Sequence, residues 1–223
     1  MEKFLCYNLY MKKNKVRTKV QTGFGHKNIL YTGKGDSGTT TLFHCDQGRI
    51  SKSSNVIEAL GSLDELNAYL GVVKVMTEGG DYFIKIGKKN FSYFYFITDI
   101  QQNLFIIQAE IGGSKMNISK SEVTKSEKII GEISKIIPPI KSFTISGGSL
   151  LSASLDYGRT LARRAERRIV AVEDEGIKKI DNNTIAYMNR LSSLLFALSR
   201  YANHLLSIKE EHPKYNKIPS KNS

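Results

Sequence analysis

The sequence contains little cysteine and no long apolar run, and these two absences exclude several classes of protein. Two cysteines in 223 residues, Cys6 and Cys45, are too few for a disulfide scaffold, a four-cysteine zinc site or an iron–sulfur cluster. The longest apolar runs, such as Leu104–Ile107, are far shorter than the roughly 20 residues that cross a bilayer. We therefore expect a soluble protein of a reducing compartment.

The chain also lacks the signatures of a catalyst that works through its own side chains. The four histidines have no metal-binding spacing, and no nucleophile elbow or Ser/His/Asp pattern occurs. If the protein is an enzyme, we expect a cofactor or a substrate to supply the nucleophile.

Basic residues exceed acidic ones by 33 to 21, a net charge of +12 that invites a nucleic-acid interpretation. Residues 1–27 carry seven basic side chains and one acidic one, and residues 209–223 carry four and two, which leaves +4 for residues 28–208. Solvated basic tails explain this distribution better than a nucleic-acid surface, which stays the minority alternative. We expect neither a nucleic-acid nor a membrane partner.

The first 27 residues resemble a mitochondrial presequence only in part. They contain a single acidic residue, but they are dominated by lysine, include one arginine and show no amphipathic apolar face. A cytoplasmic location is expected, with a mitochondrial one as the alternative.

Helical spacing of apolar residues recurs over five stretches, and an apolar fraction of 40% is enough for a sizeable core. Ser54 or Asn55 is a plausible N-cap of the first stretch, while Gly112–Gly113 and Pro138–Pro139 end the second and third. These signals predict an all-α, five-helix bundle. The expected helices span residues 55–76, 99–111, 121–137, 149–176 and 181–209.

Two regions lack the helical period. Residues 28–50, rich in glycine and threonine, are expected to form a loop or short strands, and the aromatic segment 79–97 has the composition of a small β-hairpin. The expected organisation is a basic N-terminal extension (1–27), a helix-bundle domain (28–208) with an insertion at 79–97, and a polar C-terminal tail (209–223).

The glycine-rich segment Thr32–Thr41 is the first candidate site. Its glycines match G-x-G-x-x-G, but β-branched Thr39–Thr41 follow where a dinucleotide-binding helix would begin. A Walker A loop is excluded because Thr39, not lysine, follows Gly38. What remains is either a plain surface loop or a loop whose N–H groups, hydroxyls and Lys34 suit a polyphosphate.

An arginine-rich helical stretch is the second candidate. Arg159, Arg163 and Glu166 share one narrow stripe at the edge of an apolar face. Arginines placed there form either an Arg163–Glu166 pair among solvated neighbours or an anion site for phosphates. Asp64 lies near the apolar face of the first helix and suits either solvent or a partner cation. Asn189 suits either a helix interface or a ligand contact.

Taken together, these segments resemble the PduO-type cob(I)alamin adenosyltransferases. The similarity covers roughly residues 28–207 in the family's order. It is carried by Tyr31-Thr-Gly-Lys-Gly-Asp-Ser-Gly-Thr-Thr, Arg49-x-x-Lys52, Glu58-Ala-Leu-Gly-Ser-Leu-Asp-Glu-Leu-Asn67, Phe143-Thr-Ile-Ser-Gly-Gly, Arg159-x-x-x-Arg-Arg-Ala-Glu-Arg-Arg168 and Asn189-Arg-Leu-Ser.

The resemblance implies a five-helix bundle assembled as a homotrimer with active sites between subunits. It implies transfer of the 5′-deoxyadenosyl group of ATP to the cobalt of cob(I)alamin, with release of triphosphate accompanied by Mg²⁺. A reductase and an enzyme that accepts adenosylcobalamin are possible partners. Cob(I)alamin is itself a strong nucleophile, which agrees with the missing catalytic histidine.

The resemblance also assigns roles by position. Arg159, Arg163, Asp64 and Phe143 are implied to act in catalysis: Asp64 by pairing with Arg159 of the partner subunit, and Phe143 by pressing on the lower face of the corrin. From residues of this chain alone, Phe143 would be an ordinary core residue. The residues implied to hold the nucleotide and its triphosphate are Thr32, Gly33, Lys34, Gly35, Thr40, Thr41, Lys52, Arg163, Arg164, Glu166, Arg167 and Asn189.

Two departures from the family pattern touch these sites. Gly33-Lys34 stands where relatives often have Lys-Thr, and Ser193 replaces an acid common after Asn-Arg-Leu-Ser. The alternative function is a bundle that binds cobalamin or ATP as a carrier or sensor without catalysis.

Overall fold

The structure is a computed structural model that describes residues 31–42, 48–80, 82–87 and 89–215. It divides the chain into two compact units, Met1–Lys34 and Gly35–Ser223. All the helices and strands given below belong to the second unit.

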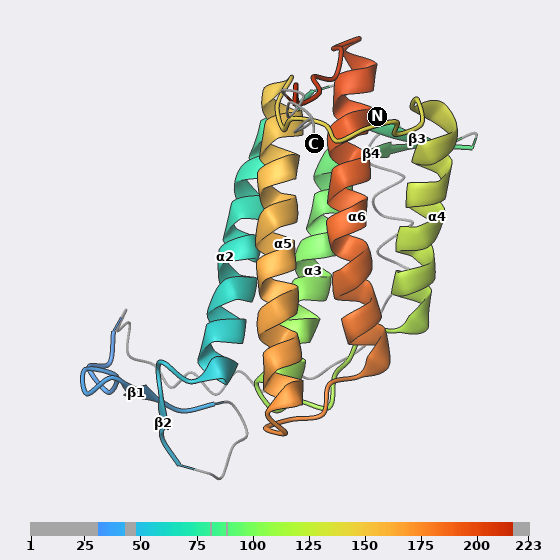
Figure 1. Ribbon diagram of the computed structural model, residues 1–223. Coiled ribbons are helices and arrows are strands. Elements are labelled where there is room, and N and C mark those ends of the chain that lie inside the picture. The colour runs from blue at the N-terminus through green and yellow to red at the C-terminus, as the bar shows by residue number, and fades with distance from the viewer. Residues whose placement is uncertain (1–30, 43–47, 81, 88, 216–223) are drawn as a thin grey trace, which may run out of the picture. The chain divides into compact units, whose positions relative to one another are not determined.

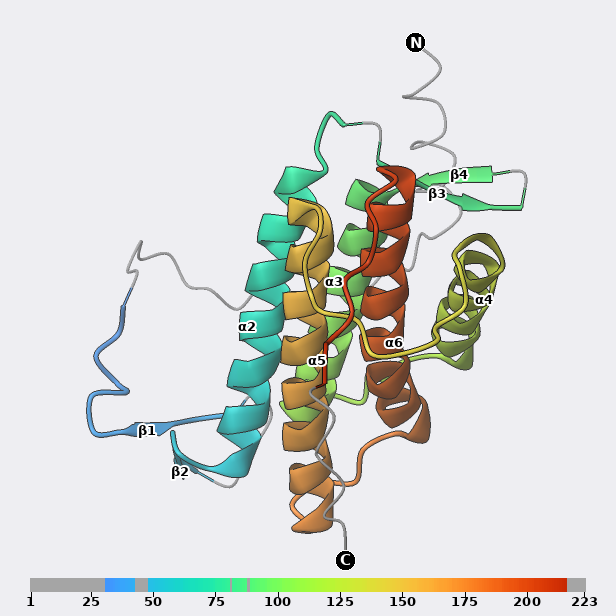
Figure 2. The same cartoon turned by 45° about the horizontal axis from the view of Figure 1, so that its top comes forward.

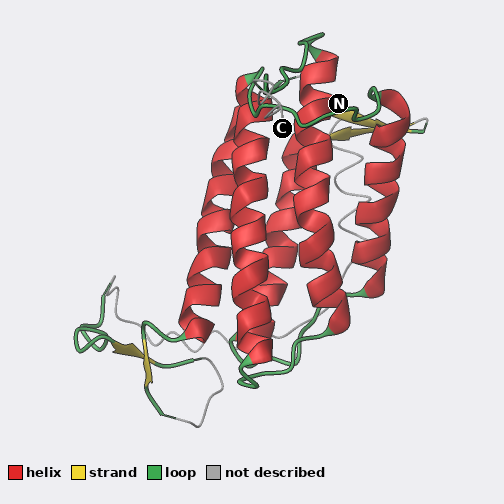
Figure 3. Cartoon of the chain, in the orientation of Figure 1, coloured by secondary structure: helices red, strands yellow, loops and turns green. Residues whose placement is uncertain are grey.

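Five α-helices form this unit within the described residues, as predicted (Figures 1 and 3). Helix α6 packs against α5 and α4, and α2 packs against α5 and α3. Leucines at helical spacing on α2, such as Leu63, Leu66 and Leu70, are fully buried between these helices. The helices are α2 (Asn55–Met76), α3 (Tyr93–Ile111), α4 (Lys120–Ile136), α5 (Leu150–Asp174) and α6 (Asn182–Leu205).

Two short hairpins accompany the helices. Strand β1 (Thr39–Thr40) pairs antiparallel with β2 (Ile50–Ser51) just before α2 begins. Strand β3 (Phe83–Ile86) pairs with β4 (Lys89–Ser92), and Gly87 at φ 59° permits the tight turn between them. The second hairpin confirms the strand prediction for the start of the 79–97 segment. It is fixed to the bundle by buried Ile84 and by Lys85 N, which donates to Tyr201 Oη at 3.2 Å.

Helix α3 begins six residues before the predicted start at Asp99, so the expectation of strand structure up to residue 97 was wrong. Tyr93, Phe96 and Ile97 are buried, and the Tyr93 hydroxyl donates to the Leu198 carbonyl of α6 at 3.0 Å. The spacing of these three residues puts them on one helical face, and packing against α6 overrides the β-propensity of aromatic residues.

Two of the five helices in the described residues, α5 and α6, are capped by a side chain at their N-terminal ends. The side chains of Ser149 and Asp181 accept from backbone N–H groups in the first turns of α5 and α6. Ser54 is the N-cap residue of α2, as predicted, but its side chain makes no capping hydrogen bond. At the other end of α6, Ile208 N donates to Asn203 O, with Ser207 at φ 54°, and this turn reverses the chain direction. None of the helices in the described residues is long and apolar enough to span a membrane.

A buried polar contact joins α3 and α6. Tyr187 is 1% exposed, and its hydroxyl accepts from Asn103 Nδ2 at 3.2 Å. Burial raises the pKa of Tyr187 above the ordinary tyrosine value, because the phenolate would lose its hydration, and the Asn103 hydrogen bond opposes only part of that shift. Burial raises the pKa of Tyr93 in the same way.

These buried tyrosines predict alkaline destabilisation. Above about pH 10 the unfolded chain loses the phenolic protons that the folded chain keeps, so the free energy of unfolding should fall as pH rises. The free energy of unfolding of the Tyr187→Phe variant should fall less steeply with pH, by roughly 1 kcal/mol per pH unit. Urea unfolding followed by circular dichroism between neutral and alkaline pH measures this difference. Tyr215→Phe, at an exposed position, is the control, and equal slopes for wild type and Tyr187→Phe would contradict the prediction.

Candidate active site

A groove of about 590 Å³ opens between α5, α6 and the loop that joins α4 to α5. It brings together Phe143, Arg159 and Arg163, three of the four residues that the sequence singled out for catalysis. Arginine side chains and an aromatic ring on one concave surface can bind an anion and an apolar ligand face together. The lining residues are Ile140, Lys141, Ser142, Phe143, Thr144, Arg159, Arg163, Ser192, Ser193 and Phe196.

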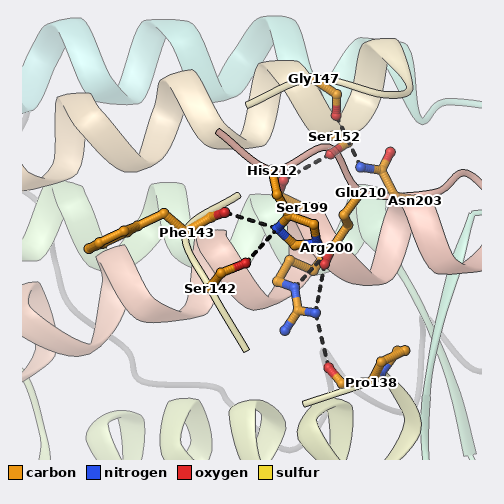
Figure 4. A network of polar contacts seen from close by, with 10 residues as sticks. All are labelled: Pro138, Ser142, Phe143, Gly147, Ser152, Ser199, Arg200, Asn203, Glu210 and His212. Atoms are coloured by element: carbon orange, nitrogen blue, oxygen red, sulfur yellow. Dashed lines mark hydrogen bonds and ion pairs between the residues drawn. The ribbon is translucent and has the colours of Figure 1, made fainter. Parts of the chain in front are cut away.

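Phe143 is the most exposed large aromatic residue of this groove, with 79% of its surface accessible. Its ring points away from the polar contacts that hold its backbone (Figure 4). The interpretation of Phe143 as an ordinary core residue is therefore wrong for the single chain. An exposed ring on a held backbone is available to a ligand.

Arg159 lines the groove and has a partner in its own helix. Its Nε donates to Asp156 Oδ1 at 3.2 Å, and the Asp156 side chain is only 9% exposed. Residues three apart share a helix face, which explains the pair. The Arg159 guanidinium carbon also lies 5.8 Å from the centre of the Phe196 ring, a cation–π contact that holds it at the groove wall.

The remaining arginines of α5 divide between two faces. Arg164 pairs with Glu65 of α2, and Arg168 lies 3.9 Å from Glu58 of the same helix. Arg163 and Arg167 are exposed, and no ion pair or hydrogen bond joins their side chains to another described residue. The structure thus separates Arg164, which is tied to α2, from Arg163, which faces the groove.

Asn189 connects α6 to α5 beside the groove. Its Nδ2 donates to Glu166 Oε1 at 3.0 Å, and its Oδ1 accepts from Arg190 Nη1 at 2.7 Å. The Arg163–Glu166 pair considered from the sequence does not form among the described residues, because Glu166 bonds to Asn189 instead. Asn189 of α6 and Glu166 of α5 are therefore neighbours.

Lys52, which follows the β1–β2 hairpin, lies close to the backbone of Gly35 and Gly38. A side chain at Gly35 would come within 2.8 Å of Lys52 Nζ, and Lys52 N donates to Gly38 O at 2.9 Å. The absence of a side chain at Gly35 thus lets an ammonium group approach the backbone closely. Thr40 lies in β1, half-buried, and the neighbouring Thr41 is exposed.

Two further groups of candidate residues are not among those that line the groove. Thr32, Gly33 and Lys34 belong to the first unit, where all three are exposed and Lys34 N donates to Thr32 Oγ1 at 3.4 Å. Asp64 is exposed on α2 and does not line the groove of its own chain.

Sequence reasoning missed several lining residues, above all Ser192 and Phe196. Both follow Asn189 on α6 at helical intervals, so the spacing that marked Asn189 could have found them. Asp156 was missed because its role depends on the neighbouring Arg159.

The chain matches the family model of cobalamin adenosyltransferases over residues 30–202. The corrinoid adenosyltransferase PduO of Citrobacter freundii is 35% identical over 182 residues, 78% of this chain and 50% of that protein. The corrinoid adenosyltransferase of Mycobacterium tuberculosis (strain ATCC 25618 / H37Rv) is 32% identical over 186 residues, 80% of this chain and 90% of that protein.

A similar solved structure is a variant of the PduO-type ATP:corrinoid adenosyltransferase from Lactobacillus reuteri, complexed with cobalamin and ATP. It has a TM-score of 0.72 and 26% sequence identity, over 83% of this chain and 97% of that one. The fold is therefore that of the corrinoid adenosyltransferase bundles, and the chain belongs to the cobalamin adenosyltransferase family. It spans about half the length of the PduO relatives from Citrobacter freundii and Salmonella typhimurium.

The exposure of Phe143 predicts that its ring contributes little to stability. We expect Phe143→Ala to change the free energy of unfolding by less than about 0.5 kcal/mol, as for ordinary surface positions. The matched control is Phe96→Ala, which removes a ring that is 7% exposed and should cost roughly 3–5 kcal/mol. Urea unfolding of both variants checks the difference. A decrease in the free energy of unfolding for Phe143→Ala as large as that for Phe96→Ala would show that Phe143 is a core residue.

Proposed function

We propose that this chain transfers the 5′-deoxyadenosyl group of ATP to the cobalt of cob(I)alamin, giving adenosylcobalamin and triphosphate. The observation that carries the proposal is the groove in which exposed Phe143 meets Arg159 and Arg163. Its support from relatives is that a solved structure with this fold holds cobalamin and ATP.

In this reaction the protein has to position the two substrates, and it does not have to transfer protons. The electron pair of cobalt(I) forms the bond to C5′ of ATP, and the C5′–O bond breaks with its pair leaving on triphosphate. A substrate that is itself a strong nucleophile needs no general base. The protein's part is to align C5′ with cobalt and to stabilise the charge of the leaving group.

Cationic side chains of two segments would supply that stabilisation. Lys52 over the Gly35 backbone and Arg163 in the groove are the residues proposed to contact the triphosphate. Thr32, Gly33, Lys34, Thr40 and Thr41 would hold the rest of the nucleotide. Arg164, Glu166, Arg167 and Asn189 are proposed to complete the wall, and the Glu166–Asn189 hydrogen bond supports that grouping.

Phe143 is proposed to press its ring on the lower face of the corrin. A ring in that place would exclude the lower axial ligand and water from cobalt(II), which makes reduction to the cobalt(I) nucleophile easier. Its 79% exposure in the single chain suits this role.

Mg²⁺ is proposed to accompany the triphosphate. The described residues contain no group of three or more His, Cys, Asp or Glu side chains that could hold a metal ion. The proposal therefore relies on phosphate oxygens and water, through which Mg²⁺ commonly binds. A reductase that supplies cobalt(I), an enzyme that accepts the product and a cytoplasmic location, with the mitochondrion as alternative, belong to the same proposal.

The test is anaerobic incubation with ATP and chemically reduced cobalamin, followed by the loss of the cob(I)alamin absorbance. Formation of adenosylcobalamin is expected. Tight binding of both substrates without turnover would overturn the enzymatic proposal and indicate a carrier or sensor.

Phe143→Ala gives a more specific prediction within this assay. When cobalt(II) and a reductant are supplied, the rate of adenosylation by the variant should fall about tenfold or more, because the lower ligand stays on the cobalt. With pre-reduced cobalt(I) the loss should be much smaller, and the KM for ATP should stay close to that of wild type. Equal losses in the two reactions would contradict the corrin-facing role.

The exposed position of Asp64 leads to a prediction about the oligomeric state. We propose a homotrimer in which exposed Asp64 pairs with Arg159 of the partner subunit, so that the pair helps to form the site. Asp64→Ala should then lower kcat by roughly tenfold while changing thermal stability little, since one charged contact at the site is lost. Glu78→Ala, an exposed acid just beyond α2, is the control. Sedimentation should give a trimer at micromolar concentration; a stable monomer, or unchanged kinetics in Asp64→Ala, would count against the pairing.

A further inference from the structure

The C-terminal segment Ser207–His212, called the strap below, lies against the loop that carries Phe143. The loop, residues 137–149, crosses α6 on its way from α4 to α5, and the chain beyond α6 runs beside it (Figure 2). The residues of the strap are polar or exposed for the most part, yet they make specific contacts with the loop. These contacts are the basis of the inference.

The strap begins with the turn that ends α6. Ser207 N donates to His204 O at 3.0 Å, and Ile208 N donates to Asn203 O at 2.9 Å. This pair of bonds, with Ser207 at φ 54°, is a Schellman turn built without the usual glycine. The turn reverses the chain onto the loop, so the strap's direction is set by hydrogen bonds of the last helical turn.

Arg200 anchors the strap to both α6 and the loop. Its side chain is 7% exposed and forms a bidentate salt bridge with Glu210. Nε lies 2.5 Å from Oε1, and Nη2 lies 2.9 Å from Oε2. The same Nη2 donates to the Pro138 carbonyl at the start of the loop at 3.0 Å (Figure 4). A buried guanidinium with planar, bidentate partners fixes geometry closely. One side chain thus ties three segments of the chain together.

Asn203 holds the other end of the loop. Its Nδ2 donates to Gly147 O at 3.0 Å and its Oδ1 accepts from Ser149 N at 2.9 Å. Gly148 has φ +95°, and a side chain there would come within 2.4 Å of Asn203 Oδ1. The loop is therefore fixed at both ends by α6, which leaves its centre around Phe143 to be held by other contacts.

Those central contacts come from the strap. Ile145 N donates to Glu211 O at 2.8 Å, and His212 Nδ1 lies 2.9 Å from both Ser142 Oγ and Phe143 O. A carbonyl oxygen can only accept a hydrogen bond, so Nδ1 carries the hydrogen and donates to Phe143. Figure 4 shows the carbonyl of Phe143 turned to the imidazole while the ring points the other way. Holding the carbonyl therefore determines where the ring is presented.

We propose that His212 is a positioning residue for adenosylation: through the strap it fixes the backbone of Phe143 and so places the ring against the corrin. The inference rests on the proposed function for its chemical consequence, and on contacts within this chain for its geometry. His212 is proposed to act only through Phe143 and to touch neither substrate. The segment that follows α6 would then support the active site through His212.

The experiment compares three variants of the full-length protein. His212→Leu removes the donor, whereas His212→Asn keeps an N–H at the same number of bonds from Cα as Nδ1. Glu211→Leu is the matched control, because its exposed side chain is replaced while the carbonyl that binds Ile145 N remains. Two readouts are used: hydrogen exchange of the loop amides around residues 142–146, and the rate of adenosylation from cobalt(II) relative to that from pre-reduced cobalt(I).

His212→Leu is expected to speed exchange of the loop amides and to lower the cobalt(II)-to-cobalt(I) rate ratio by roughly three- to tenfold, the effect of losing one hydrogen bond. His212→Asn should restore both readouts, and Glu211→Leu and the KM for ATP should match wild type. Unchanged exchange in His212→Leu, or faster exchange with an unchanged rate ratio, overturns the proposal. If wild type makes no adenosylcobalamin, the proposed function fails and positioning for adenosylation falls with it. The exchange readout then still tells whether His212 holds the loop.

Discussion

The burial of α6 on nearly its whole circumference is the constraint on which the rest of the structure depends. Fourteen of its 24 residues are buried, polar ones among them. A helix of this kind must be covered on every side. Helices α4 and α5 cover two sides, and α3 contributes the Tyr93–Leu198 and Asn103–Tyr187 hydrogen bonds. The part near its C-terminal end is covered by the Phe143 loop and the strap, so the covering of one helix also builds the candidate site.

One stripe of α6 connects the different parts of that site. Asn189, Ser192, Phe196, Arg200 and Asn203 follow one another at intervals of three or four residues and therefore share a face. Asn189 contacts Glu166 beside the groove, and Ser192 and Phe196 line the groove wall. Arg200 binds Glu210 of the strap, and Asn203 binds the loop at Gly147. The Phe196 ring lies within 6.0 Å of both the Arg159 and the Arg200 guanidinium carbons. A displacement of α6 would therefore move the groove wall, the strap and the Phe143 loop together.

The sequence was sufficient for those features that repeat locally. The five helices and the hairpin were predictable because helical and strand periods are short-range properties. The start of α3 was not, since Tyr93 and Phe96 favour strands until packing on α6 decides otherwise. The groove residues Phe143, Arg159 and Arg163 were found in advance, but their partners were not. The Arg164–Glu65 pair and the strap contacts join residues far apart in the chain, and several use backbone carbonyls that carry no sequence signal.

The distance along the chain between the strap and its loop has a consequence for how the protein is made. Phe143 and His212 are 69 positions apart, and α5 and α6 lie between them. Synthesis proceeds from the N-terminus, so the loop emerges from the ribosome before any residue that holds its centre. The bundle can assemble around α5 and α6 while the centre of the Phe143 loop is still unsupported. The centre of the Phe143 loop can therefore be fixed only after the strap, 69 positions later in the chain, has been made.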